Sequence, residues 1–169
     1  MAIDIGADAI ARALTVNNST FRLCLIEGSN PATKSGTIKK VYFYLQGDIA
    51  FAVEIGIFYK TNGDTFSSRD SVTIPEAVIG LNEADVELDI QVGDYIGILL
   101  VQMPGGNGLA LAYDAEWTND YWRTLAGSTF PYTDYEFNNL GKRIISVYGE
   151  LEKAGMVGMN PALKELMGY

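Results

Sequence analysis

The run VGDYIGILLVQM, residues 92–103, constrains the fold more than any other part of the sequence. It carries a single charge, Asp94, and suits either a membrane segment or a buried strand. A spanning helix needs about 20 apolar residues, whereas this run ends at Pro104-Gly105-Gly106. We therefore predict a central strand that packs on one face and is covered on the other, with subunit contact as one source of the cover.

The composition favours one β-rich domain over a helical bundle. The chain has 169 residues, 48% hydrophobic and 20% charged, which suits one domain with a proper core. Its 18 glycines and ten tyrosines favour strands joined by tight turns. The net charge of −9 argues against nucleic acid or an anionic membrane as a partner.

The sequence contains no histidine and a single cysteine, Cys24. Without histidine the chain lacks the commonest general base and the usual zinc ligand, so we expect no enzymatic activity and no cofactor. Cys24 lies in the apolar stretch FRLCLI and is interpreted as a buried hydrophobic side chain. The first residues, MAIDIGADAIARAL, lack a basic leader and an apolar block, so no secretory signal is expected.

Alternating and apolar segments predict about eight strands. They cover residues 20–27, 37–46, 51–60, 68–74, 84–90, 94–103, 108–117 and 143–152. An Asn-Gly pair predicts a hairpin between the third and fourth strands. Strand 108–117 is expected to pair back on 94–103 across the Pro-Gly-Gly-Asn turn. Together these strands predict an all-β fold, an antiparallel β-sandwich of jelly-roll type over residues 1–152.

Residues 153–169 differ in character from the sandwich. Asn160, Pro161 and Gly168 are the cap, first-turn and stop signals of a short C-terminal helix. A helix this short needs a surface to pack on, which is either its own sandwich or a neighbouring subunit. We favour the subunit, with interface contacts from an arm that contains Leu163, Leu166, Met167, Met156 and Met159.

Charged residues of the strands receive structural interpretations. Arg69 is expected to bridge to a carboxylate on a neighbouring strand, and Asp94 to bond the backbone of its own turn. Asp85, Glu87 and Asp89 alternate outward, as a solvated or edge-protecting row. The alternative is calcium bound by this row or by loop acids, namely Asp114, Glu116, Asp120 and Asp134.

The segment from Tyr113 to Phe137 is the richest in aromatic residues, which are interleaved with Asp, Asn and Thr. Such a segment suits a protein interface, a cap over the core, or a site where rings stack on sugars. All three interpretations stay open at this point. The candidate residues of this aromatic loop are Tyr113, Trp117, Tyr121, Trp122 and Tyr132.

Five segments follow one another over residues 3–149: IDIGADAIAR, NPATKSGTI, IGIFYKTNGDTFSSRD, IQVGDYIGI and IISVYG. In this order they resemble a family of small all-β proteins from phage and environmental viral genomes. The resemblance implies a virion or surface component with a jelly-roll fold, and it assigns no catalytic residue. Similar proteins end soon after the Tyr-Gly pair, so the C-terminal arm is a feature of this chain.

The sequence thus predicts a non-enzymatic structural protein of a virion or other extracellular assembly, such as a capsid decoration, head-fibre or tail-type subunit. Its expected partners are copies of itself and a capsid or other virion protein, after synthesis in the host cytoplasm. The alternative is a carbohydrate-binding module that recognises host-surface glycans through the aromatic loop. A glycoside hydrolase would need two paired carboxylates, and the sequence singles out no such pair.

Overall fold

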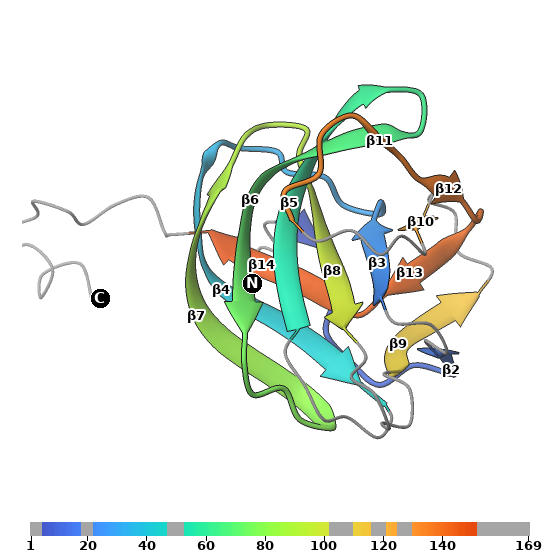
Figure 1. Ribbon diagram of the computed structural model, residues 1–169. Helices are drawn as coiled ribbons and strands as arrows, with labels where there is room; N and C mark the ends of the chain where they lie inside the picture. The colour runs from blue at the N-terminus through green and yellow to red at the C-terminus, as the bar shows by residue number, and fades with distance from the viewer. Residues whose placement is uncertain are drawn as a thin grey trace, which may run out of the picture.

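The computed structural model describes residues 5–17, 22–46, 53–101, 110–115, 121–124 and 130–151. Over these ranges the chain is all-β, as predicted, and every strand pairing is antiparallel. The strands form two sheets with a hydrophobic core between them (Figure 1). The described ranges contain 14 strand segments, where the sequence predicted about eight.

The first sheet, sheet A, contains the neighbours β2 (Leu14–Asn17), β9 (Ala110–Ala115), β4 (Gly36–Leu45) and β7 (Gly80–Ile90) in that order. The closing strand, predicted as one segment, is interrupted at Ser146. Its first half, β13 (Arg143–Ile145), pairs with β9, and its second half, β14 (Val147–Leu151), pairs with β4. A short β1 (Ile5–Gly6) pairs with β14.

The second sheet, sheet B, has the order β6 (Thr65–Ile74), β5 (Val53–Asn62), β8 (Tyr95–Val101), β3 (Arg22–Glu27) and β10 (Tyr121–Thr124). Two short strands extend it: β11 (Tyr135–Glu136) pairs with β6, and β12 (Asn138–Asn139) pairs with β10. Because Phe137 alone separates β11 from β12, one segment joins the two edges and nearly closes the sheet.

The pairing of β8 corrects one prediction. The hairpin at Asn62-Gly63 is present, and Gly63 takes the positive φ of 49° that favours glycine there. The predicted hairpin between 94–103 and 108–117 is wrong, because β8 pairs with β5 and β3 while β9 belongs to sheet A. A strand buried on both faces occupies the middle of a sheet, where strands from distant parts of the chain pair with both of its edges.

The main core fills the space between the sheets. Its β4 residues Val41, Phe43 and Leu45 and its β7 residues Val86, Leu88 and Ile90 point inward, as the alternation predicted. From sheet B the buried side chains of the middle strand, Ile96, Ile98 and Leu100, meet them.

The opposite face of sheet B is also buried. A second cluster covers it, formed by Cys24, Ile26, Phe58, Phe66, Leu99, Trp122, Tyr132 and Phe137. Trp122, Tyr132 and Phe137 come from β10 and the segment around β11. The cover over strand β8 is therefore supplied by this chain's own aromatic residues, where the sequence suggested subunit contact. In Figure 1 the β11 and β12 segment arches across the upper end of sheet B.

The C-terminal arm, with its expected helix, lies outside the described residues. Across the described ranges, no helix has the length and apolar character needed to cross a membrane.

Candidate functional site

The structure places three of the five aromatic-loop candidates in defined surroundings. Trp122 and Tyr132 are buried, with 3% and 2% of their surface exposed. Tyr113 is half-buried in β9, and the Arg143 guanidinium of the neighbouring strand β13 lies over its ring, with Cζ 5.1 Å from the ring centroid. The side chains of Trp117 and Tyr121 lie outside the described set.

Hydrogen bonds hold the buried rings inside the protein. The Trp122 Nε1–H donates to Asp64 Oδ1 at 2.7 Å, and the Tyr132 N–H donates to Ser68 Oγ at 2.8 Å. The Phe137 N–H donates to the Asp64 carbonyl at 2.9 Å. Trp122 and Tyr132 therefore pack as core and present no ring face to a ligand.

Two glycines make room for this aromatic cover. Gly56 of β5 and Gly97 of β8 are cross-strand neighbours in sheet B. A Cβ atom on Gly56 would lie 2.2 Å from Cζ of Phe130, and one on Gly97 would lie 2.6 Å from Cε2 of Phe58. The rings therefore pack directly on bare backbone, which fixes the aromatic segment against the sheet.

Arg69 forms an ion pair with a carboxylate, as predicted, but the carboxylate belongs to Asp94 in the turn before β8 and not to a neighbouring strand. Arg69 Nε and Nη2 donate to the two carboxylate oxygens of Asp94, at 2.6 and 3.1 Å. Asp94 also accepts the Gln91 N–H at 2.8 Å, as predicted for its turn. The bonds to Asp94 raise the pKa of Arg69 above its ordinary value. The pair therefore ties β6 to the turn before β8.

Glu27 is a buried carboxylate that the sequence analysis missed. Its Oε1 accepts the Ser29 N–H and its Oε2 accepts the Ile145 N–H, both at 2.7 Å. Burial raises the pKa of Glu27, against the opposing effects of these bonds and of the Arg12 charge. The strand alternation held the signal, since Leu23, Leu25 and Glu27 share the core-facing side of β3. Glu27 links sheet B to β13 of sheet A.

Arg12 binds Ser146, the residue that follows Ile145, the backbone partner of Glu27. Its Nε donates to Ser146 Oγ at 2.6 Å, and its Nη1 donates to Asp114 Oδ2 at 3.1 Å. Ser146 Oγ in turn donates to the Ile10 carbonyl at 2.8 Å. These bonds surround the break at Ser146, where the closing strand stops pairing with β9 and begins to pair with β4. The carboxylates of Glu27 and Asp114 are therefore engaged in holding the backbone.

Cys24 lies fully buried in the aromatic cluster, as predicted. Burial raises the pKa of its thiol far above the ordinary value. The thiol thus stays protonated and contributes as a hydrophobic side chain.

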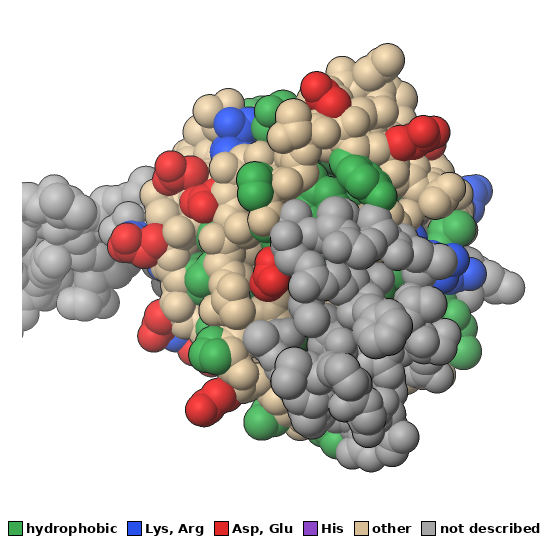
Figure 2. All heavy atoms as spheres, viewed as in Figure 1, with side chains coloured by type: hydrophobic (Ala, Val, Ile, Leu, Met, Phe, Trp, Pro, Cys, Tyr) green, Lys and Arg blue, Asp and Glu red, His purple; other side chains and the backbone are tan. Residues whose placement is uncertain are grey.

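The acidic row on β7 faces outward as predicted, and two of its members, Asp85 and Glu87, are paired with lysines of β4. Lys39 Nζ lies 2.6 Å from Glu87, while Lys40 Nζ contacts Glu83 and lies 3.1 Å from Asp85. The bond from Lys39 lowers the pKa of Glu87. Figure 2 shows acidic side chains along the side where β7 runs. No group of three or more potential metal ligands occurs in the part of the chain that the structure describes; the expectation of no cofactor and its calcium alternative both stay predictions.

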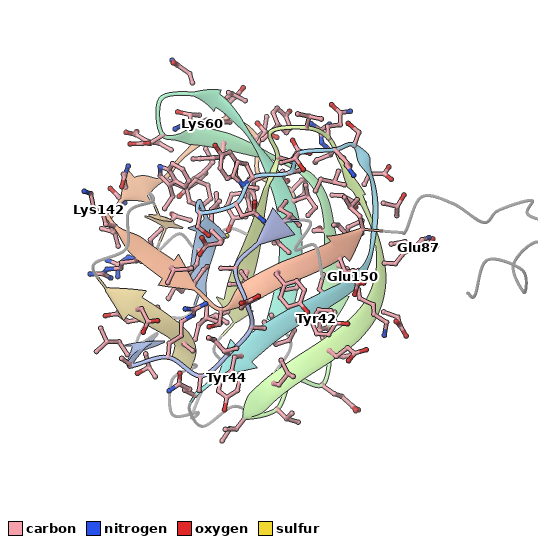
Figure 3. The ribbon with its side chains drawn as sticks, turned by 180° about the vertical axis from the view of Figure 1, so that it is seen from behind. Tyr42, Tyr44, Lys60, Glu87, Lys142 and Glu150 are labelled. Carbon is pink, nitrogen blue, oxygen red and sulfur yellow. The ribbon has the colours of Figure 1, made fainter. Side chains whose placement is uncertain are left out.

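The outer face of sheet B is covered by the aromatic cluster described above. On the outer face of sheet A, two tyrosines lie side by side. Tyr42 of β4 and Tyr148 of β14 are cross-strand neighbours whose rings stack at 4.5 Å and 9°. The Tyr42 hydroxyl donates to Glu150 Oε2 at 3.5 Å. Partial burial raises the pKa of Tyr42, and the charges of Glu83 and Glu150 raise it further. Figure 3 shows Tyr42 and Glu150 beside each other over β4 and β14.

Three apolar side chains stand at one end of this face, and we call them the apolar tip. They are Val78, Ile79 and Leu81, which are 58%, 61% and 56% exposed. Leu81 is the cross-strand neighbour of Tyr44. The sequence analysis did not single these residues out, although VIGL is an apolar run in front of an otherwise alternating strand.

The side-chain amide of Asn82 fixes the shape of the apolar tip. Its Oδ1 accepts the Val78 N–H at 2.8 Å, and its Nδ2 donates to the carbonyls of Val78 and Gly80 at 2.8 and 3.0 Å. Gly80 has φ of +100°, a backbone conformation that favours glycine. A rigid loop therefore holds three large apolar side chains in solvent, which is the arrangement of a preorganised contact surface.

Comparison with known protein families, with curated proteins and with solved structures gave no match.

Proposed function

We propose that the protein is a non-enzymatic structural subunit of a multi-protein assembly, of the kind found in a virion. The apolar tip carries this proposal, because the Asn82 amide holds Val78, Ile79 and Leu81 rigidly exposed. Exposed apolar side chains in a fixed conformation lose little entropy when a partner covers them. We propose that the partner at the apolar tip is a neighbouring copy of this chain.

The energy of the tip suits an assembly with several contacts per subunit. Full burial of one such side chain contributes about 1.5–3 kcal/mol, so completing the burial of three half-exposed ones contributes on the order of 3–5 kcal/mol. Association alone costs about 4–15 kcal/mol. The tip is therefore too weak to hold two copies by itself and needs a second contact. The C-terminal arm, with Leu163 and Leu166, is the second contact that we propose.

The strand order supports a jelly-roll topology for this subunit. Sheet A has the order β2-β9-β4-β7 and sheet B the order β3-β8-β5-β6, so that successive strands cross repeatedly between the sheets. Two four-stranded antiparallel sheets connected in this way are typical of jelly rolls. In this proposal β13, β14, β1 and β10 to β12 are additions to the eight-stranded frame.

The engaged polar groups support the non-enzymatic part of the proposal. Glu27, Asp94 and Asp114 bond backbone or arginine groups that fix the fold. A general acid or base must instead reach the proton of a substrate. The carbohydrate-binding alternative depends on the aromatic loop, and the burial of Trp122 and Tyr132 removes two of its five candidate rings as platforms for a sugar.

Sedimentation velocity over a wide range of concentrations tests the proposal on the full-length chain. We expect the wild type to associate as its concentration rises, and Ile79→Ser with Leu81→Ser to weaken association. Leu163→Asp with Leu166→Asp should weaken it as well, with an unchanged far-ultraviolet spectrum in both cases.

Val92→Ser is the matched control, because Val92 is 66% exposed but lies in the turn that follows the opposite end of β7. It should leave association unchanged. A wild type that stays monomeric at every concentration, or double variants that associate like the wild type, would refute the assembly role at these contacts.

A further inference from the structure

The outer face of sheet A beyond the apolar tip carries an excess of negative charge. Across neighbouring strands, Tyr148, Tyr42 and Glu83 form one row, and Glu150, Lys40 and Asp85 form the next. Lys40 is the cation of these two rows, and it contacts Glu83 and Asp85 on the β7 side. Glu150, on the other side of Lys40, has the Tyr42 hydroxyl at 3.5 Å as its partner. The carboxylate of Glu150 therefore has capacity to accept a further donor.

The tyrosine pair gives this charged face a shaped aromatic surface. Tyr148 covers one face of the Tyr42 ring through stacking at 4.5 Å. Because the two rings belong to adjacent strands, the other face of Tyr42 is turned toward β7, where Glu83 is its neighbour. An aromatic ring whose hydroxyl edge lies beside the Glu150 carboxylate matches the chemistry of a guanidinium, which stacks on rings and donates two parallel hydrogen bonds to a carboxylate.

We propose that this face docks a partner protein of a different kind from this chain, through an arginine side chain that stacks on Tyr42 and pairs with Glu150. The proposal goes beyond the assembly of copies through the apolar tip. Charge complementarity selects the partner: this chain has a net charge of −9, and two copies that met through this face would oppose their carboxylates. A basic protein surface meets no such repulsion.

Nuclear magnetic resonance titration of the isotope-labelled full-length protein tests the site. The probe is the peptide acetyl-Gly-Arg-Gly-Arg-Gly-amide, compared with the same peptide carrying lysine in place of arginine. We expect the largest shift changes at Tyr42, Glu83 and Glu150, with tighter binding of the arginine peptide because lysine lacks the planar fork.

Matched variants separate a specific site from general attraction to acidic residues. Glu150→Gln should weaken the arginine peptide about two- to five-fold, as expected for one exposed ion pair, and Tyr42→Ser should abolish the preference for arginine over lysine. Glu87→Gln is the control, since Glu87 pairs with Lys39 at the margin of the face (Figure 3), and it should bind like the wild type.

Absence of localised shift changes, equal binding of the two peptides, or equal weakening by Glu150→Gln and Glu87→Gln would each overturn the proposal. Sedimentation of Glu150→Gln distinguishes this result from a failure of the assembly role, because the variant leaves the apolar tip intact and should associate like the wild type.

Discussion

Replacement of Phe137 by alanine tests whether the aromatic segment is part of the core. Phe137 is 2% exposed, and its ring contacts those of Phe58, Phe66 and Tyr132 at 5.6–5.8 Å between centroids. Truncation of a buried phenylalanine costs about 3–5 kcal/mol. Domains of this size are stable by about 5–15 kcal/mol, so the variant should still fold but lose a large part of its free energy of unfolding.

Urea unfolding followed by tryptophan fluorescence and circular dichroism measures this loss. Thermal unfolding gives a second measure: at about 2–4 °C per kcal/mol, the melting temperature should fall by roughly 6–20 °C. Val92→Ala is the control, because Val92 is 66% exposed and truncation of an exposed side chain should cost under about 1 kcal/mol. A loss in Phe137→Ala no greater than that of the control would refute the interpretation of this segment as core.

Two further substitutions test the packing of sheet B and the buried carboxylate. Gly97→Ala should destabilise the protein by about 1–3 kcal/mol, because the new methyl group would lie 2.7 Å from the Leu25 carbonyl oxygen; unchanged urea unfolding would contradict the close approach. The pKa of Glu27 is raised above its ordinary value of 4.5 in the folded state, so the folded protein binds this proton more tightly than the unfolded chain. The free energy of unfolding should therefore decrease as pH rises from 4.5 through the raised pKa, and Glu27→Gln should reduce that slope. Equal slopes in the two proteins would show that Glu27 does not contribute it.

The sequence predicted strands correctly where one face of the strand is buried and the other is solvated. The inward sides of β4 and β7, such as Phe43 and Leu88, follow directly from a period of two residues. The hairpin at Asn62-Gly63 followed from local turn chemistry, and Asp94 bonded its own turn for the same reason. These features depend on residues that are close in sequence.

The pairing of β8 and the position of the aromatic residues could not be predicted in this way. The sequence predicted that 94–103 would pair with 108–117, yet segments far along the chain pair with both edges of β8. The aromatic segment left three interpretations open because ring composition is the same for a core, an interface and a sugar site. Burial of Trp122 and Tyr132 by distant strands decided between them for these residues.

The sequence by itself determined that this protein is all-β, because alternation and turn residues act over a few positions. The tertiary structure alone decided which surfaces remain open. Sheet B is covered by its own aromatic segment because Gly56 and Gly97 let rings reach the backbone, while the Asn82 amide keeps the apolar tip exposed on sheet A. Both results arise from contacts between segments distant in sequence or from the shape of one loop, and the free energy of such contacts depends on the packed three-dimensional arrangement.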